Sequence, residues 1–420
     1  MKTRFEKICI WLAGITVAGW LVFTYTGVAI SQVFAERLGA KLLKVSGGKF
    51  DEPAVFILGR IREMLVLLTA AMVLLAISLM LNRVLKKHAS YASYRGLILG
   101  VVIFAMMNVF AWFAGKTVLF WSLFYHKTQI DNFAQYQIKN ALLRELKGRA
   151  RAILIGNSQT NASIDEVVMN ELIGREVWST ELVQPGSRGF DMLTLIRTMS
   201  LMEDDLVICY LSEGYFYGGE SGIVAADFFS LAEIPDLIEL KGWELFPPGA
   251  AQSGLAAQIF PLYQFRKSFS HKVLGWDITN LQQRKFNQSL EENLETQARR
   301  RAPDLKFGKV SEFEQAAMSR AVQEMVSRGC TVIFIAGHMH PDVQRFMDQR
   351  LRPDMNRFLG RLKAEGKGRV FIVEGSELLH LQPADFKDLV HFTSDTQRRF
   401  TIELVNYLKR QFPEMFAPVQ

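Results

Sequence analysis

Apolar positions follow two different patterns along this chain. Near the N-terminus, three long runs each hold about 17–25 nearly uncharged residues, the length needed to cross the hydrocarbon core of a membrane. They are Ile8–Ile30, Met64–Leu81 and Leu97–Gly115. The first run is too long for the apolar region of a signal peptide and lacks a small-residue cleavage site, so we expect it to be retained. We predict a membrane domain with three transmembrane helices over residues 1–122; the alternative is that these runs are buried helices of a soluble core.

Basic residues predict the orientation of these spans. Lys2, Arg4 and Lys7 precede the first span. The loop between the second and third spans contains Arg83, Lys86, Lys87 and Arg95. Because basic loops stay on the cytoplasmic side, we expect a multi-pass protein of the cytoplasmic (inner) membrane whose C-terminal part is extracytoplasmic, that is, periplasmic. Six Lys or Arg between Ser31 and Arg62, in a loop that would be external, count against this orientation.

A different pattern follows the third span. Residues 123–149 are predicted to form an amphipathic connector, since their apolar residues are spaced as on one face of a helix. From Ala150 onward, short apolar runs alternate with helical patterns. The predicted strands are Ala152–Ile155, Val177–Val183, Leu206–Leu211, Thr331–Ala336 and Val370–Val373. The predicted helices are Ile164–Leu172, Asp191–Met202, Glu312–Ser327, Asp342–Lys363 and Thr396–Gln411.

This alternation predicts an α/β fold over residues 150–420, with a doubly wound, flavodoxin-like parallel sheet and helices on both faces. Residues 213–305 interrupt the alternation, and we interpret them as a helical insertion that acts as a lid or a docking element. In such a fold, sites gather at the carboxyl ends of the strands.

Composition adds limits on function. The chain of 420 residues is 49% hydrophobic, and its net charge of +7 is concentrated beside the predicted spans, where basic residues set topology and contact lipid head groups. We therefore expect the lipid bilayer as a partner and no nucleic acid. The 3 cysteines form no set of pairs and show no metal-ligand spacing, so no structural disulfide is expected.

A polar stretch follows the first predicted strand. Residues 153–165 read ILIGNSQTNASID, which places Ser158 beyond the carboxyl end of that strand, at the start of the loop leading to a helix. Backbone N–H groups at such a position can face a developing negative charge, which suits a serine nucleophile. Alternatively, Gly156, Asn157 and Ser158 only form the strand-to-helix turn, since all three are common turn residues.

A base for this serine occurs near the C-terminus. A serine hydroxyl needs a base to accept its proton, and the base needs a partner that orients it. Asp388 and His391 lie three residues apart in the sequence DLVH, just before the last predicted helix, so one loop can present both side chains. Such a pair also arises by chance, and an isolated histidine is more often a capping or surface residue.

Gly-x-Ser after the first strand and DxxH before the final helix together resemble the SGNH (GDSL-type) hydrolase and acyltransferase superfamily. The resemblance extends from Ala150 to about Phe412 in order and topology. It implies an SGNH-like domain without a cofactor, in which Ser158 is the nucleophile, His391 the general base and acid, and Asp388 its orienting partner. Asn157 replaces the aspartate of the GDS signature.

The resemblance also implies an oxyanion hole, formed by the amide of the nucleophile, a glycine after the second strand and an asparagine after the third. In QPGSRGFDML, Gly189 is the best match for that glycine and Gly186 for the glycine before it; the alternative is a plain glycine-rich turn. After the third strand, SEGYFYGG contains no asparagine. Its possible substitutes are Ser212, Glu213 and Tyr215. Otherwise the hole has one donor fewer, which typically costs roughly 3–4 kcal/mol of transition-state stabilisation.

A second constellation competes with the serine site. The sequence AGHMHPD holds His338, His340 and Asp342 at the end of the fourth strand, an HxHxD string similar to metal sites of hydrolases. The binuclear pattern would continue with a further histidine, but Val343 stands there. We therefore predict no metal site, and we expect His338 and His340 to line the rim of the active site or to be ordinary loop residues; a metal site is the alternative.

The layout is similar to that of the teichoic acid D-alanine transfer protein and of alginate-type O-acetyltransferases. This resemblance implies an O-acyltransferase or esterase that acts on a cell-envelope polysaccharide or polymer through an acyl-serine. Its implied partners are a polysaccharide or polyol acceptor and a multi-spanning membrane-bound O-acyltransferase or polysaccharide synthesis complex. The alternative is a non-catalytic SGNH-like factor that binds glycan or holds an assembly together.

Overall fold

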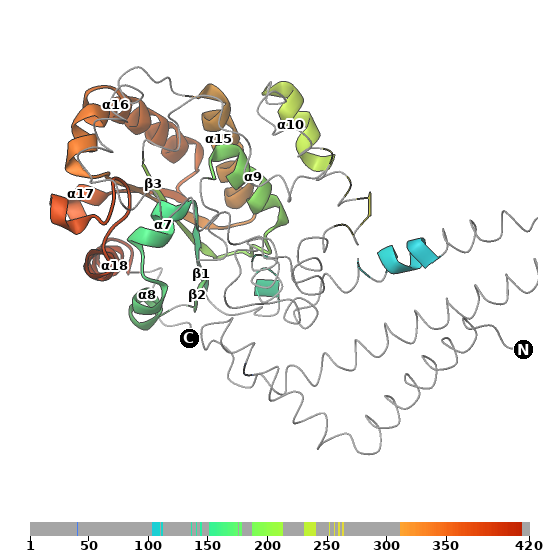
Figure 1. Ribbon diagram of the computed structural model, residues 1–420, viewed down its shortest axis with the longest axis horizontal. Coiled ribbons are helices and arrows are strands. Elements are labelled where there is room, and N and C mark those ends of the chain that lie inside the picture. The colour runs from blue at the N-terminus through green and yellow to red at the C-terminus, as the bar shows by residue number, and fades with distance from the viewer. Residues whose placement is uncertain are drawn as a thin grey trace, which may run out of the picture. The chain divides into compact units, whose positions relative to one another are not determined.

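The computed structural model describes residues 151–174, 176–178, 187–212, 231–240 and 311–413, together with 103–109 and the separate residues 40, 111, 136, 140, 143, 144, 252, 256, 259, 260 and 263. The chain divides into two compact units, one formed by 1–129 with 259–275 and the other by 130–258 with 276–420. The second unit carries the sheet and the helices that cover it (Figure 1).

A five-stranded sheet forms the centre of the second unit, in the order β2-β1-β3-β4-β5. Its strands are β1 (Arg151–Ile155), β2 (Glu176–Trp178), β3 (Leu206–Leu211), β4 (Thr331–Ala336) and β5 (Val370–Glu374). All neighbouring strands pair in parallel, as in the flavodoxin-like class of doubly wound sheets. The prediction of an α/β fold with a parallel sheet is confirmed. For the second strand, residues 179–183 of the predicted range lie outside the described part of the chain.

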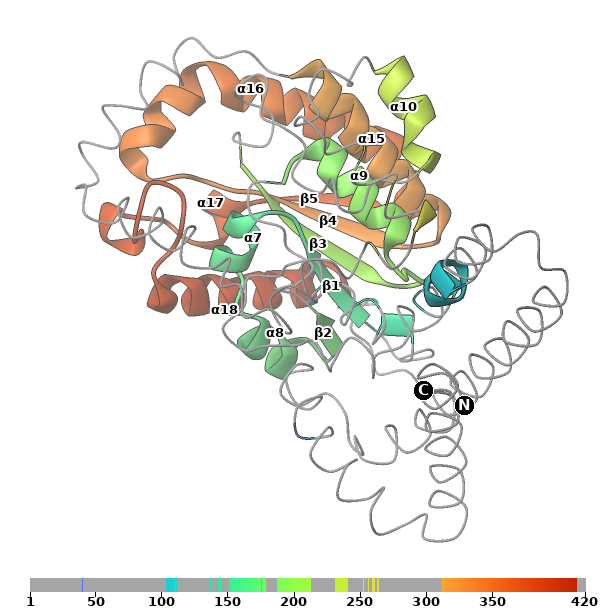
Figure 2. The same cartoon turned by 45° about the vertical axis from the view of Figure 1, so that its right-hand side comes forward.

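Helices lie on both faces of the sheet (Figure 2). On one face are α7 (Ser158–Ser163), α8 (Glu166–Ile173) and α18 (Ser394–Gln411), and α18 packs against both of the others. The other face carries α9 (Gly189–Thr198), α15 (Glu312–Ser327) and α16 (Pro341–Glu365). The shorter helices are α10 (Ile234–Glu239), α17 (Gly375–Leu378) and the 3-10 turns η4 (Leu231–Glu233) and η7 (Pro383–Asp385).

Burial on both faces explains why the strands read as continuous apolar runs rather than alternating ones. Every residue of β3, which has the sequence LVICYL, is buried. On the face of the sheet that carries α18, the ring of Tyr210 contacts those of Phe392 and Phe400 edge-on, with ring centroids 5.9 Å and 5.8 Å away. This aromatic cluster joins β3 to α18 and to the loop that precedes α18.

The helix boundaries differ from the predicted ones where caps decide them. The sequence places Ser158 in a loop, but it is the first residue of α7, which was not predicted. This helix has only 6 residues, too few to show a helical period, and it begins because the Asn157 side chain accepts the amide N–H of Gln159. The next helix starts at Glu166 because Asp165 caps it in the same way.

The C-terminal part of the predicted connector is anchored to α9. Tyr136, Asn140 and Leu143 are spaced as one helical face and are buried. The Tyr136 hydroxyl contacts Thr198 Oγ1 at 2.6 Å, and the Asn140 side chain donates to the Thr198 carbonyl at 2.7 Å. The apolar positions used to predict this helix lie outside the described residues.

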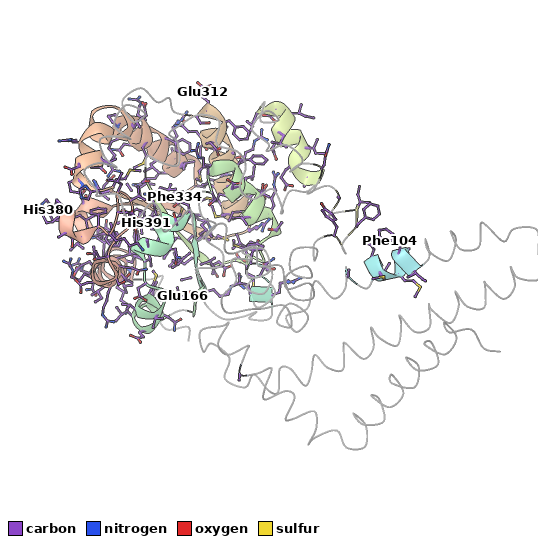
Figure 3. The ribbon with its side chains drawn as sticks, in the orientation of Figure 1. Phe104, Glu166, Glu312, Phe334, His380 and His391 are labelled. Carbon is purple, nitrogen blue, oxygen red and sulfur yellow. The ribbon has the colours of Figure 1, made fainter. Side chains whose placement is uncertain are left out.

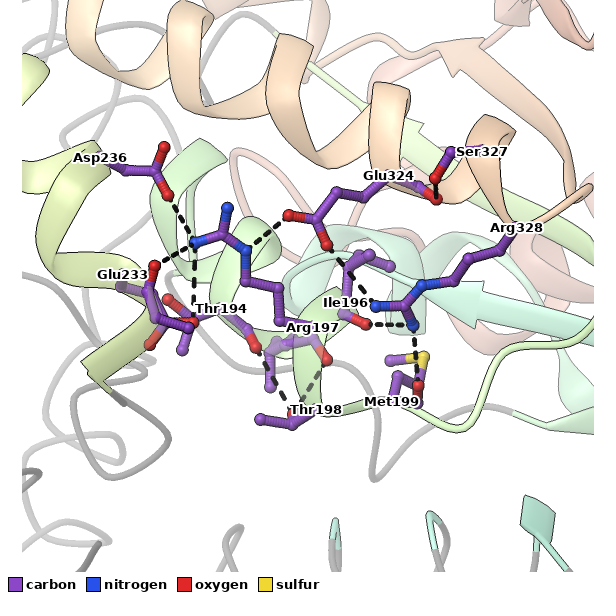
Figure 4. Close-up of polar contacts among 12 residues, drawn as sticks. Thr194, Ile196, Arg197, Thr198, Met199, Glu233, Asp236, Glu324, Ser327 and Arg328 are labelled. Carbon is purple, nitrogen blue, oxygen red and sulfur yellow. Dashed lines mark hydrogen bonds and ion pairs between the residues drawn. The ribbon is translucent and has the colours of Figure 1, made fainter.

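An ion-pair network fastens α10 to α9 and α15 (Figure 4). Arg197 of α9 lies 2.5 Å from Asp236 of α10 and 2.5 Å from Glu324 of α15. Arg320 of α15 also pairs with Asp236. Apart from residues 231–240 and five isolated positions, the predicted insertion over 213–305 lies outside the described residues, so its role stays a prediction.

Two of the three predicted membrane spans, 8–30 and 64–81, lie outside the described residues. Within the third, residues 103–109 are helical, and Phe104, Met107 and Val109 are exposed. The ring of Phe104 contacts that of Phe260. Within the part of the chain that the structure describes, no helix has the length and apolar character needed to cross a bilayer.

The buried ion pair of Arg151 gives a stability prediction. Its guanidinium contacts both carboxylate oxygens of Asp205, at 2.7 Å and 2.5 Å, and both side chains are nearly inaccessible. Arg151→Met leaves this carboxylate buried without its partner and should lower the free energy of unfolding by about 3–5 kcal/mol. The control is Arg357→Met, which removes a largely exposed pair with Asp354 and should cost less than about 1 kcal/mol. Urea titrations that gave equal losses for the two variants would contradict this prediction.

Candidate active site

The backbone places Ser158 at the carboxyl edge of the sheet. Gly156 follows β1 with a φ of 138°, a conformation that favours glycine, and turns the chain sharply into α7. The hydroxyl of Ser187 donates to the Gly156 carbonyl at 2.9 Å, which ties this turn to the chain just before α9. Farther along α7, the Thr160 hydroxyl donates to the carbonyl of Tyr210 near the end of β3 at 3.2 Å. Hydrogen bonds from Ser187 and Thr160 therefore hold the turn and the helix that position Ser158.

A closed loop presents Asp388 and His391. Phe386 and Phe392 form an antiparallel bridge, and their buried rings pack edge-on with centroids 5.2 Å apart. Inside this bridge, the Lys387 amide donates to the carbonyl of His391 at 3.0 Å. Oδ1 of Asp388 accepts the amide N–H groups of residues 390 and 391, at 2.9 Å each. The DxxH spacing therefore matches one tight, self-bonded turn.

The two regions meet in a hydrogen-bonded chain of three side chains. Nδ1 of His391 lies 2.7 Å from Oδ2 of Asp388, and Nε2 of His391 lies 2.9 Å from the Oγ of Ser158. All three side chains are part-buried, and His391 lies beside α7 in the side-chain view (Figure 3). The structure therefore brings together the three residues that the sequence singled out as nucleophile, base and orienter.

Asp388 determines which ring nitrogen of His391 carries the proton. Burial raises the pKa of Asp388, but the hydrogen bond and charge of His391 and the two backbone amides outweigh burial, so that the pKa falls below its ordinary value of 3.8. An ionised carboxylate accepts the N–H at Nδ1 of His391. Nε2 is then the lone-pair nitrogen and accepts the Ser158 hydroxyl proton, as a general base must.

Helix α18 connects the loop that carries His391 to the helix that carries Ser158. The Gln397 amide donates to the carbonyls of Asn161 and Ile164 at the end of α7, at 2.7 Å and 3.0 Å. Thr401 accepts the amide N–H of Asp165 at 2.8 Å. Because α18 begins directly after the loop of His391, these bonds fix the distance between the base and the helix of the nucleophile.

Gly189 lies at a helix contact. It begins α9, where a side chain would overlap the carbonyl oxygen of Glu314. The Glu314 carboxylate accepts the amide N–H of Phe190 at 2.9 Å and also a hydrogen bond from the Gly189 amide. The structure thus shows Gly189 packed against α15 with its amide engaged, and its role as an oxyanion donor stays a prediction. Gly186 lies outside the described residues.

Ser212, the first residue after β3, contacts Gln159, the residue of α7 that follows Ser158. The hydroxyl of Ser212 donates to Oε1 of Gln159 at 2.6 Å, and both side chains are buried. Sequence reasoning did not single out Gln159 or Ser187. The only available signal for Gln159 was its position directly after the serine. Glu213 and Tyr215 lie outside the described residues.

The two histidines of the HxHxD string have structural partners. His340 is buried and caps α16, where its Nδ1 accepts the Asp342 amide at 3.2 Å. Burial lowers the pKa of His340, which keeps it neutral for this role. Nε2 of His338 accepts a bond from Arg352 at 2.7 Å, because a guanidinium can only donate. Among the described residues, no three His, Cys, Asp or Glu side chains are grouped to hold a metal ion.

The HxHxD sequence nevertheless contacts the loop that carries His391. The amide of His340 donates to the carbonyl of Leu389, inside the DLVH turn, at 3.0 Å. This backbone contact supports the turn that carries the base, and a position of the His338 and His340 side chains at the rim of the site stays a prediction.

Glu314 gives a prediction about pH. Burial raises its pKa from 4.5 to about 7, and the charge of Asp191 adds to the rise. A raised folded-state pKa means that the stabilising contribution is complete below the unfolded value and is lost as the pH rises through about 7. Between pH 4 and pH 8, the free energy of unfolding of the wild type should fall by roughly 3 kcal/mol relative to Glu314→Gln.

Urea titrations at the two pH values measure this difference. Glu312→Gln is the control, since Glu312 lies on the exposed side of the same helical turn. An unchanged gap between the wild type and Glu314→Gln at both pH values would contradict the prediction.

Comparison with known proteins adds no assignment. No protein-family model matches the chain, and no curated protein matches it.

Proposed function

We propose that this protein is a membrane-anchored, extracytoplasmic O-acyltransferase or esterase that works through an acyl-serine intermediate. The observation that carries the proposal is the chain Asp388–His391–Ser158, with contacts of 2.7 Å and 2.9 Å between heavy atoms. A carboxylate, an imidazole and a hydroxyl in this order form the arrangement that activates a serine for attack on a carbonyl carbon. The order of the motifs and the parallel sheet support membership of the SGNH superfamily.

The reaction proceeds in two displacements. Ser158 Oγ forms a bond to the carbonyl carbon of an ester or thioester while its proton moves to Nε2 of His391, and the carbonyl π electrons become an oxyanion. The intermediate collapses to an acyl-serine as the bond to the leaving group breaks, and His391 returns the proton to that group. A hydroxyl or a water molecule, deprotonated by His391, then attacks the acyl-serine. The bond from the acyl carbon to Ser158 Oγ breaks, and His391 returns the proton to that oxygen.

The acceptor decides between transferase and esterase. We propose a hydroxyl of a cell-envelope polysaccharide or polyol as the acceptor, in line with the resemblance to alginate-type O-acetyltransferases and to the teichoic acid D-alanine transfer protein. Transfer to a sugar requires that water be kept out of the site. We assign that role to the insertion over 213–305, and we propose a multi-spanning O-acyltransferase or polysaccharide synthesis complex as the source of the acyl group.

A fluorophosphonate probe tests the nucleophile. Such a probe forms a bond to an activated serine with loss of fluoride, so we expect the full-length wild type to be labelled and Ser158→Ala to remain unlabelled. His391→Ala should slow labelling by at least about 100-fold, because the general base is lost. Gel fluorescence against time measures the rates.

Ser163→Ala is the matched control, because Ser163 is a buried serine of the same helix outside the hydrogen-bonded chain. It should label at the wild-type rate. An unlabelled wild type, or equal labelling of Ser158→Ala, would favour the non-catalytic glycan-binding or assembly role. The absence of an asparagine in SEGYFYGG is the observation on the side of that alternative.

The proposed membrane location has its own test. Three spans with a cytoplasmic N-terminus place the C-terminus outside, so alkaline phosphatase fused after Gln420 should be active in intact cells and green fluorescent protein at the same position should be dark. A bright fluorescent fusion with an inactive phosphatase would overturn the extracytoplasmic assignment while leaving the chemistry of Ser158 untouched.

A further inference from the structure

The side chain of Gln159 has an unusual set of partners. It directly follows Ser158, and only 5% of its surface is exposed. Its Oε1 accepts the hydroxyl proton of Ser212 at 2.6 Å, a length that fits O–H···O better than N–H···O. Its Nε2 is buried and has no hydrogen-bond partner among the residues that the structure describes. The short contact therefore identifies Oε1 as the end of the amide that meets Ser212, and the N–H donors are not used in this contact.

A buried donor without a partner opposes folding, because it loses its bonds to water and gains none in return. Native structures contain few such groups, and a catalytic role is among their explanations. Here the donor belongs to the residue beside the proposed nucleophile, at the carboxyl ends of the neighbouring strands β1 and β3. Ser212 fixes the amide from the β3 side, so the donor is oriented before a substrate arrives.

We propose that Nε2 of Gln159 donates a hydrogen bond to the oxyanion formed during acyl transfer at Ser158. This inference rests on the proposed function and names a residue that the proposed function does not require. As the bond from Ser158 Oγ to the acyl carbon forms and the proton moves to His391, the carbonyl oxygen gains the negative charge. The Gln159 N–H stabilises that charge without itself transferring a proton.

The location suits this role for two physical reasons. A preorganised donor shielded from water stabilises a developing charge more strongly than a solvated one. In addition, Ser212 uses its own hydroxyl proton on Gln159, so Ser212 acts as a positioning residue for the amide and not as the donor to the oxyanion. The tie from Thr160 to the carbonyl of Tyr210 holds this part of α7 against β3.

Two variants test the donor on the full-length protein with p-nitrophenyl acetate. Gln159→Glu keeps an oxygen for Ser212 and replaces the N–H donor by an oxygen. The double variant Gln159→Met with Ser212→Ala removes both polar groups while keeping the volume of the longer side chain. Both should lower kcat by about 10²–10³-fold with KM within about threefold of the wild type, since a donor to the oxyanion acts in the transition state.

Ser163→Ala is the control, because within the described part of the chain its buried hydroxyl also has no hydrogen-bond partner and belongs to the same helix. It should retain the kcat of the wild type. If either folded Gln159 variant retains kcat within about threefold while Ser158→Ala is inactive, the inference about Gln159 fails and the proposed function stands. A wild type that neither hydrolyses the ester nor reacts with the fluorophosphonate overturns both.

Discussion

The contact between His391 and Ser158 joins residues that are 233 positions apart, and an all-parallel sheet makes it possible. Each crossover helix returns the chain to the amino edge of the sheet, so every strand delivers its last residue to the same carboxyl edge. Ser158 follows the first strand, and the loop of His391 follows the fifth. No local interaction could bring them together. The distance between the base and the nucleophile therefore depends on the packing that sets the strand order.

The sequence predicts the parts of this arrangement that depend on local signals. Strands buried on both faces appear as short apolar runs, so β3, with its sequence LVICYL, is visible without any structure. The DLVH turn is also local, because Asp388 bonds to the amides of the next few residues and presents His391 from within the same loop. Residue type and spacing suffice for both.

Contacts between distant residues set the limits of such prediction. Helix α7 has 6 residues and no apolar period, so Ser158 was expected in a loop. Gln159 was not singled out because Ser212, its partner, is 53 positions away. Likewise, the glycine pattern that makes Gly189 a plausible oxyanion donor cannot reveal that Glu314 accepts its amide. For Gln159 and for Gly189 the deciding partner comes from another crossover.

Hydrogen bonds from other parts of the fold hold α7, the helix that begins with Ser158, before substrate binds. Its N-terminal turn is held by Ser187 at Gly156, its middle by Thr160, and its C-terminal end by Gln397 of α18. A helix of this length is marginal on its own, so these bonds and not helix propensity keep it folded. Because they order the nucleophile before substrate binds, little conformational entropy remains to be lost during the reaction. The bond from Ser212 to Oε1 holds the Gln159 side chain, and its buried Nε2, which has no hydrogen-bond partner among the described residues, lowers the stability of the fold.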